Sequence, residues 1–163
     1  MHNKIKTVQE LRPLLDILRA AGREIVFTNG CFDLIHTGHT RYLANAKSFG
    51  DLLIVAVNSD ASVRGIKGEK RPINTGADRM ETLAALEAVD YVVLFNEPDP
   101  RRTIEELQPD VLVKGGDWPI EKIIGRDIVE AGGGKVISVG YIEGASTTGI
   151  IEKILKMYSK TGR

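Results

Sequence analysis

The chain has 163 residues, the length of one domain, and its 22 Lys and Arg residues balance 22 Asp and Glu residues. This balance argues against a protein that coats nucleic acid, which needs a net basic surface. A single cysteine excludes an intramolecular disulfide and a cysteine-rich zinc site. The longest apolar run, Leu52 to Val57, is too short to span a bilayer, and residues 1–24 lack the apolar segment of an export signal. These features predict one cytoplasmic globular domain over 1–163, with no nucleic-acid or membrane partner.

The spacing of apolar residues predicts helices and strands that alternate along the chain. Helices are expected over 8–18 (ended by Gly22), 38–49, 75–89, 103–107, 120–130 with an interruption near Gly125, and 147–158. Strands are expected over 24–28, 52–58, 91–95, 111–114 and 136–139. Residues 59–74 mix basic side chains with Gly and Pro, which predicts a mobile basic loop. In the last helix, the apolar stripe of Ile150, Ile151, Ile154 and Leu155 is expected to face inward.

Such an alternation indicates an α/β fold, a Rossmann-like, doubly wound, parallel five-stranded sheet with helices on both faces. Open parallel sheets bind ligands beyond the carboxyl ends of their strands, where the strand order reverses. We therefore expect the ligand site among the loops that follow Thr28, Asn58, Phe95, Lys114 and Gly140.

The loop after the first strand leads into a helix start, where free backbone N–H groups favour phosphate. His36 and His39 lie three residues apart and project on one side, with only Gly38 beside them. Two imidazole donors at this place suit a polyphosphate and the extra charge of a pentacoordinate phosphorus. Two other interpretations stay open, a metal site and a capping or core role. A metal site is disfavoured because the third histidine is at position 2.

Three hydroxyl residues open the last helix, Ser146, Thr147 and Thr148. One of them is expected to be an N-cap, which is the usual role of Ser and Thr there. All three together also suit a second phosphate cradle. The basic loop from Arg64 to Arg71 is either a solvated excursion or a lid that closes on an anionic substrate. Arg79, a cation in the first turn of its helix, opposes the helix dipole, which a bound phosphate would offset.

Two motifs of the chain resemble the cytidylyltransferase-like nucleotidyltransferase superfamily. The first is a strand that leads into His36-Thr37-Gly38-His39, and the second is a Ser/Thr-rich helix start about 110 residues later. Nearly the whole chain further resembles the adenylyltransferases that make ADP-heptose for bacterial lipopolysaccharide. The segments that carry this closer resemblance are Thr28-Asn29-Gly30-Cys31-Phe32-Asp33, Val57-Asn58-Ser59-Asp60, Lys67-Gly68, Arg71-Pro72, Leu86-Glu87-Ala88-Val89-Asp90, Lys114-Gly115-Gly116-Asp117 and Ser146-Thr147-Thr148. The chain has no room for the sugar kinase of fused relatives, so the resemblance implies the stand-alone form.

The resemblance implies transfer of AMP from ATP, accompanied by Mg²⁺, to D-glycero-β-D-manno-heptose 1-phosphate, with release of pyrophosphate. Carried over by position, His36, His39 and Lys67 are the expected catalytic residues. The expected nucleotide and phosphate ligands are Thr28, Asn29, Gly30, Cys31, Phe32, Asp33, Gly38, Asn58, Asp60, Lys70, Arg71, Arg79, Lys114, Gly115, Asp117, Ser146, Thr147 and Thr148. Among these, Asp33 and Asp60 are expected to order their loops. No metal ligands from the protein are expected, and the resemblance is compatible with a homodimer.

Two departures concern the choice of substrate. Related glycerol-phosphate cytidylyltransferases carry Arg-Thr-Glu-Gly before the hydroxyl cluster, whereas this chain has Tyr141-Ile142-Glu143-Gly144. Position 31, Thr in those relatives, is Cys31 here. These differences disfavour a cytidylyltransferase with glycerol 3-phosphate, which stays the alternative enzyme. A nucleotide-binding module without catalysis is the alternative of another class.

Overall fold

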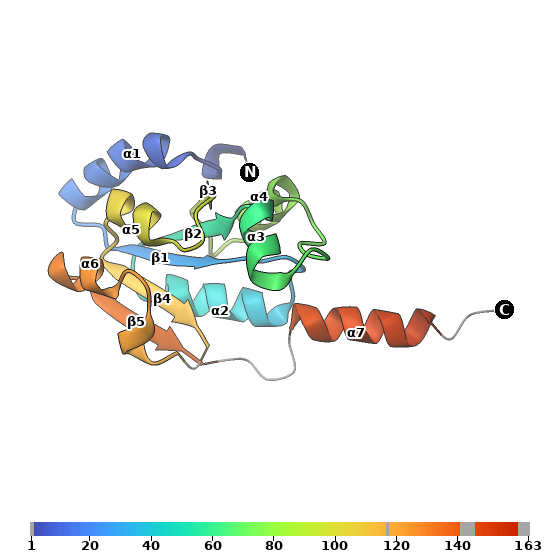
Figure 1. Cartoon of the computed structure of the whole chain (residues 1–163). Coiled ribbons are helices and arrows are strands. Elements are labelled where there is room, and N and C mark those ends of the chain that lie inside the picture. Colours follow the sequence, from blue (N-terminus) through green and yellow to red (C-terminus); the bar gives the residue numbers. More distant parts are fainter. Residues whose placement is uncertain (1, 117, 141–145, 160–163) are drawn as a thin grey trace.

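The computed structural model describes residues 2–116, 118–140 and 146–159 of the chain. Its five parallel strands form one sheet in the order β3-β2-β1-β4-β5 (Figure 1). The strands are β1 (Ile25–Gly30), β2 (Leu52–Asn58), β3 (Tyr91–Phe95), β4 (Val111–Gly115) and β5 (Lys135–Val139). The predicted Rossmann-like sheet is thereby confirmed, with each strand within one or two residues of its expected bounds.

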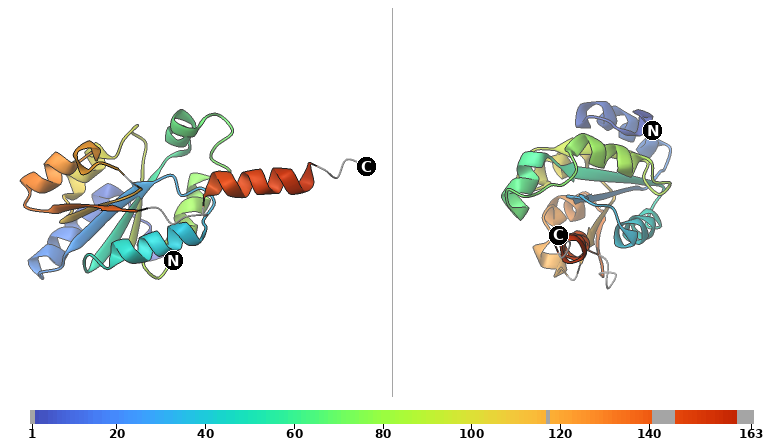
Figure 2. Two further views of the ribbon diagram at one scale, coloured as in Figure 1. Left: turned by 90° about the horizontal axis from the view of Figure 1, so that it is seen from below. Right: turned by 90° about the vertical axis from the view of Figure 1, so that its right-hand side faces the viewer.

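Helices cover both faces of the sheet, as expected (Figure 2). The helices are α1 (Val8–Ala20), α2 (Thr37–Lys47), α3 (Asp60–Lys67), α4 (Gly76–Ala84), α5 (Arg101–Leu107), α6 (Arg126–Ala131) and α7 (Thr147–Tyr158), with short 3₁₀ turns at His2–Lys4 and Ile120–Lys122. Successive side chains of a strand point to opposite faces. Ile25 and Phe27 therefore pack with α1, α5 and α6, whereas Val26 packs with α2 and α4.

The strand order reverses between β1 and β4, because β1 pairs with β2 on one side and with β4 on the other. The crevice outside the carboxyl ends of these two strands is the place where such sheets bind ligands. The connection from β1 to α2 and the residues that follow β4 lie there.

Residues 59–74 depart from the prediction, because they contain the helix α3 rather than a loop alone. Ser59 caps this helix by accepting a hydrogen bond from the Ser62 N–H, and Val63 buries its side chain completely. Two further helices are shorter than predicted. α4 ends at Ala84, and the helix expected over 120–130 splits at Gly125, whose φ of +89° interrupts it as anticipated.

The helix α7 has the predicted bounds but not the predicted packing. It leaves the carboxyl edge of the sheet and projects away from the domain (Figures 1 and 2). None of its described residues is buried, and Ile154 and Leu155 are 47% and 61% exposed. The expectation that its apolar stripe faces inward is therefore wrong in this structure.

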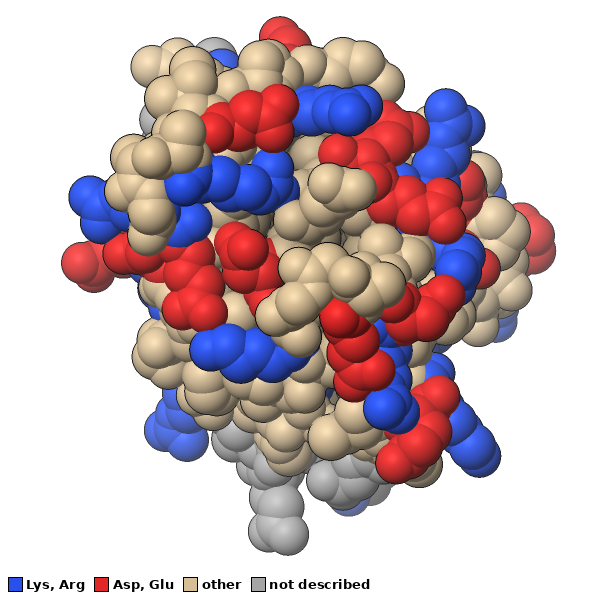
Figure 3. Space-filling model, turned by 90° about the vertical axis from the view of Figure 1, so that its left-hand side faces the viewer, with Lys and Arg blue, Asp and Glu red and all other residues tan. Residues whose placement is uncertain are grey.

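The end of the sheet opposite the ligand edge carries interleaved charges of both signs (Figure 3). At the amino ends of the strands, Arg23 pairs with Asp51 and Lys135 pairs with Glu24. Among the described residues, none of the helices has the length and apolar character that crossing a bilayer demands.

Candidate active site

A pocket of about 630 Å³ opens at the carboxyl edge of the sheet. Its walls come from the β1–α2 connection, the ends of β2 and β4, the end of α3, the loop after β3 and the start of α7. The volume lies in the range of small-molecule and cofactor sites. It is the crevice in which the strand order predicts a ligand.

The first wall of the pocket is shaped by close packing at Gly30 and Phe32. A Cβ atom at Gly30 would lie 2.9 Å from the Phe32 ring, which leaves no space for a side chain. Phe32 has a left-handed backbone (φ 46°) and is only 5% exposed. Its ring also contacts His39, with 5.4 Å between the ring centroids. This packing brings the chain from β1 into α2 with the histidines facing the pocket.

His36 is the N-cap of α2 and His39 lies in its first turn. Their rings stack, with centroids 3.8 Å apart and planes inclined by 24°, and both line the pocket. The Nδ1 atoms of both rings are buried and have no hydrogen-bond partner among the described residues. Ring packing and, for His39, an interaction with the Leu34 backbone therefore hold the two imidazoles.

Burial lowers the pKa of both histidines. Desolvation, reinforced by the neighbouring His36 ring, lowers the pKa of His39 to about 4. Burial also lowers the pKa of His36 below its usual value. Both rings are neutral at pH 7 without ligand, so each has one N–H donor and one acceptor nitrogen. A nearby triphosphate would raise both pKa values again.

Asp33 holds the basic segment from Arg71 to Asn74 against this first wall. Its carboxylate accepts hydrogen bonds from the backbone N–H groups of Ile73 and Asn74 and, at 2.6 Å, from Arg71 Nε. Burial alone would raise the pKa of Asp33, but these hydrogen bonds outweigh it and lower the pKa. The segment is thus anchored at Asp33, and the stretch between the end of α3 and Arg71 is the exposed part.

Arg79 does not face the pocket, contrary to the expectation that it binds phosphate. The residue is 1% exposed, and its guanidinium donates to backbone oxygens of Asn74, Cys31 and Asn58 and to the Asp60 carboxylate. These acceptors belong to three separate segments of the chain, around residues 31, 58–60 and 74. Arg79 is therefore a structural link beneath the site, and its hydrogen bonds leave the guanidinium no exposed donor for a ligand.

Three cationic side chains line the pocket. Arg71 is paired with Asp33, as described above. Lys114, at the end of β4, donates only to the neutral side chain of Asn29, at 3.2 Å, and burial lowers its pKa. Lys67, at the end of α3, has no ion pair among the described residues. Two of the three ammonium and guanidinium groups thus lack a protein counter-charge, which favours an anionic ligand.

The opposite wall is the start of α7. Ser146 is its N-cap and accepts a hydrogen bond from the Gly149 N–H, and Thr147 Oγ1 donates to the Leu34 backbone oxygen at 3.3 Å. The three hydroxyl residues line the same pocket as His36 and His39, about 110 residues earlier in the chain. The structure thus brings together the two motifs that the sequence analysis paired.

Most of the predicted site residues lie at the pocket, although their individual roles stay predictions. The lining includes Asn29, Gly30, Cys31, Phe32, Asp33, His36, Gly38, His39, Asn58, Lys67, Arg71, Lys114, Gly115, Ser146, Thr147 and Thr148. Four predicted residues do not line it. Thr28 and Arg79 are buried beneath it, Asp60 contacts Arg79, and Lys70 is exposed to solvent. Asp117 and the segment Tyr141 to Gly144 lie outside the described residues.

Several residues that line the pocket were not among the predicted site residues: Tyr42, Ile66, Pro98, Asp99, Pro100, Gly116, Trp118, Ile124 and Gly140. Tyr42 has an identifiable structural role, because its hydroxyl lies 2.6 Å from Thr28 Oγ1 and its ring occupies the space beside Gly115. Asp99 belongs to a loop that the strand order already singled out. Its place between two prolines at a strand end was the signal that could have identified it.

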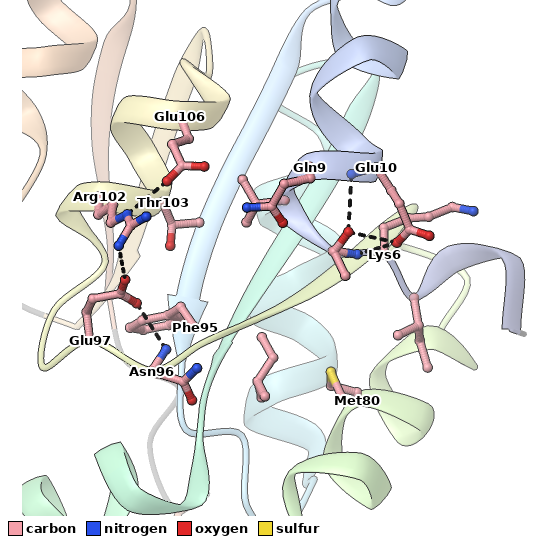
Figure 4. Close-up of a pocket in the computed structure, with 14 residues that line it drawn as sticks. Lys6, Gln9, Glu10, Met80, Phe95, Asn96, Glu97, Arg102, Thr103 and Glu106 are labelled. Carbon is pink, nitrogen blue, oxygen red and sulfur yellow. Dashed lines mark hydrogen bonds and ion pairs between the residues drawn. The ribbon is translucent and has the colours of Figure 1, made fainter.

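A second pocket, of about 490 Å³, lies between the start of α1, the end of β3 and α5 (Figure 4). Its charged groups are mostly satisfied within the protein. Arg102 pairs with Glu97 and Glu106, and Glu10 forms a capping box with Thr7. It contains none of the predicted site residues, so the chemistry belongs to the first pocket.

A family model described as "Cytidylyltransferase-like" matches residues 27–153. The chain belongs to this family. The prediction of a nucleotidyltransferase is thereby confirmed at the level of the family, and the matched range includes the histidine pair and the hydroxyl cluster.

Relatives and solved structures agree with this family. The chain is 54% identical, over 96% of its length, to a protein of Geobacter metallireducens named "Bifunctional protein HldE", and it spans only 32% of that relative. A solved structure of a lipopolysaccharide core biosynthesis protein from Thermoplasma volcanium is 29% identical, with a TM-score of 0.65 over 75% of this chain and 100% of that one. A pantoate–β-alanine ligase from Francisella tularensis shares the fold, with a TM-score of 0.61 at 16% identity over 95% of this chain and 77% of that one.

Proposed function

We propose that the chain transfers AMP from ATP to D-glycero-β-D-manno-heptose 1-phosphate, forming ADP-heptose and pyrophosphate for lipopolysaccharide biosynthesis. The observation that carries the proposal is the single pocket that His36 and His39 share with Ser146, Thr147 and Thr148. The segments quoted above for the ADP-heptose-forming enzymes and the similarity to a lipopolysaccharide core biosynthesis protein support the acceptor. ATP as a substrate favours a cytoplasmic location, which stays a prediction, as does a homodimer.

In the proposed reaction, an oxygen of the sugar phosphate attacks the α-phosphorus of ATP. A new phosphorus–oxygen bond forms, the bond between the α-phosphorus and its bridge to the β-phosphate breaks, and pyrophosphate leaves with the electron pair of that bond. His36 and His39 donate N–H groups to the phosphate oxygens as charge accumulates there. The hydroxyls at the start of α7 hold the β- and γ-phosphates, and Lys67 approaches from the end of α3.

Mg²⁺ is expected to arrive with the triphosphate and to neutralise part of its charge. No group of three His, Cys, Asp or Glu side chains among the described residues forms a metal-binding cluster. Mg²⁺ commonly binds through substrate phosphates and few protein ligands, so its arrival with ATP does not require such a cluster. The pocket residues then bind and orient the phosphates themselves.

The test is an assay of pyrophosphate release by the purified chain with ATP, Mg²⁺ and the heptose 1-phosphate. We expect ADP-heptose as the product, and we expect His39→Ala to lower kcat by roughly 10²- to 10³-fold, as for other lost donors that stabilise transition-state charge. CTP with glycerol 3-phosphate is the matched alternative pair, and faster turnover with it would refute the proposed acceptor. Nucleotide binding without any pyrophosphate release would instead indicate a module without catalysis.

A further inference from the structure

Asp99 is a carboxylate in a pocket built for anions. Apart from Asp33, which is neutralised by Arg71 and two backbone N–H groups, it is the only acidic residue among the described residues that line the pocket. A negative charge beside bound phosphates weakens their binding. The residue therefore needs a ligand group that a carboxylate binds well.

The loop that carries Asp99 is held in place from below. Asn58 Nδ2 donates to Ser62 Oγ at 3.0 Å, and Ser62 Oγ donates to the Glu97 backbone oxygen at 3.1 Å. Pro98 and Pro100 flank Asp99 and restrict its backbone. The loop is thus tied to the end of β2 and the start of α3.

The Asp99 side chain is fixed by one oxygen and free at the other. Oδ1 accepts a hydrogen bond from the Arg101 N–H at 2.9 Å, at the start of α5. Within the described part of the chain, Oδ2 has neither a hydrogen bond nor an ion pair. Asp99 thus lines the pocket with one carboxylate oxygen held by a backbone N–H and the other without a hydrogen bond among the described residues.

The pocket that Asp99 lines also has apolar walls. Pro98 and Pro100 flank it in the chain, and Ile66 and Ile124, which line the same pocket, are 51% and 47% exposed. A sugar presents both C–H faces and hydroxyl donors, so it matches apolar surface next to a carboxylate oxygen. Mg²⁺ bound to substrate phosphates commonly takes one or two protein carboxylates as well, so the Mg²⁺ dependence of turnover is measured alongside the sugar-phosphate kinetics.

We infer that Asp99 binds a hydroxyl group of the sugar-phosphate acceptor and so contributes to acceptor specificity. This inference rests on the proposed function, because it assigns a part of the same pocket to the sugar. The acceptor then lies with its phosphate toward the cationic and histidine side of the pocket and its hydroxyls toward the loop after β3. Asp99 takes no part in the transfer of the nucleotidyl group itself.

The test compares steady-state kinetics of the wild-type chain with those of Asp99→Ala and Asp99→Asn, varying heptose 1-phosphate, ATP and Mg²⁺ in turn. Loss of a hydrogen bond to a charged group predicts a rise in KM for the sugar phosphate of roughly 10- to 100-fold for Asp99→Ala. Asp99→Asn keeps an acceptor oxygen and the bond to Arg101, so its KM is expected to rise less. The KM for ATP, the Mg²⁺ dependence and kcat are expected to change little.

Glu97→Gln is the matched control, because Glu97 lies on the same loop but its side chain faces the second pocket (Figure 4). An unchanged KM for the sugar phosphate in Asp99→Ala would overturn the inference and leave the proposed function standing. A shift confined to the Mg²⁺ dependence would also overturn it, in favour of a metal ligand. A wild-type chain without turnover on the sugar phosphate would instead refute the proposed function, and this inference with it.

Discussion

The two walls of the pocket are held in different ways. The wall formed by the β1–α2 connection is held by buried groups. Asp33 binds the Arg71–Asn74 segment, and Arg79 beneath it binds oxygens of three segments of the chain. The wall formed by the start of α7 is attached to that connection by a single hydrogen bond among the described residues, from Thr147 to Leu34. One wall is thus part of the core, and the other is appended to it.

This difference bears on how the site works. A wall that is ordered before binding keeps the histidines in place without cost when the nucleotide arrives. A wall with few contacts to the core can adjust to the ligand, because local stability follows the number of buried contacts. We therefore expect substitutions in the first wall to change stability and substitutions in the second to change affinity.

The largest effect is expected for Arg79→Ala. The Asp60 side chain is 35% exposed, so the cost comes mainly from the backbone oxygens of Cys31, Asn58 and Asn74 that lose their donor. A buried acceptor without a partner costs about 1–3 kcal/mol, so we expect a loss of about 3 kcal/mol of unfolding free energy. Urea unfolding followed by circular dichroism measures this loss. Arg101→Ala removes an exposed pair with Asp127 and is the control, with an expected cost below about 1 kcal/mol. If Arg79→Ala does not fold, the same measurement is made on Arg79→Lys. A free energy of unfolding equal to that of the wild type in either variant would show that the hydrogen bonds of Arg79 do not stabilise the fold.

Thr148→Ala is expected to have a smaller effect, which concerns nucleotide affinity rather than stability. The Thr148 side chain is exposed and lines the pocket, so its loss removes a hydroxyl from the phosphates and nothing from the core. We expect nucleotide affinity to fall about tenfold, the low end for a hydrogen bond to a charged group, with an unchanged Tm. Calorimetric titration with ATP measures the first and thermal unfolding the second.

Thr82→Ala is the control for Thr148→Ala, since Thr82 is an exposed hydroxyl residue on α4 away from the pocket. A Tm loss in Thr148→Ala that Thr82→Ala does not share would show that α7 belongs to the core. In that case the contrast between the two walls is wrong.

The elements that the sequence predicted well are those with a strong and local signal. The continuous apolar run of β2 reads as a strand covered on both faces, which the structure confirms. The helix α3 was missed because only two of its residues, Ser62 and Val63, are buried, and the basic residues around them read as a loop. For α7 the periodicity correctly indicates an apolar face, but periodicity does not indicate what covers such a face.

The site shows the same limit at the level of single residues. His36 and His39 were predictable because their spacing at a helix start determines that they share a side. Arg79 was misassigned because its type and position show a cation, whereas its role depends on acceptors from 31, 58, 60 and 74 that only the fold brings together. Asp99 was not identified because its significance depends on what else lines the pocket.

The smallest expected effect concerns the protonation of His39. It tests whether the first wall binds the nucleotide with a change in charge and without a change in structure. The pKa of His39 is about 4 without ligand, so the ring is neutral at pH 7. A bound triphosphate favours the charged form and raises this pKa. The protein therefore takes up protons on binding, and affinity falls as the pH rises through the pKa in the complex. Titration calorimetry in two buffers of different ionisation enthalpy is expected to show uptake of a fraction of a proton, smaller in His39→Asn. Equal uptake in both proteins would show that His39 stays away from the phosphates, since the proton taken up by the nucleotide itself is the same in each.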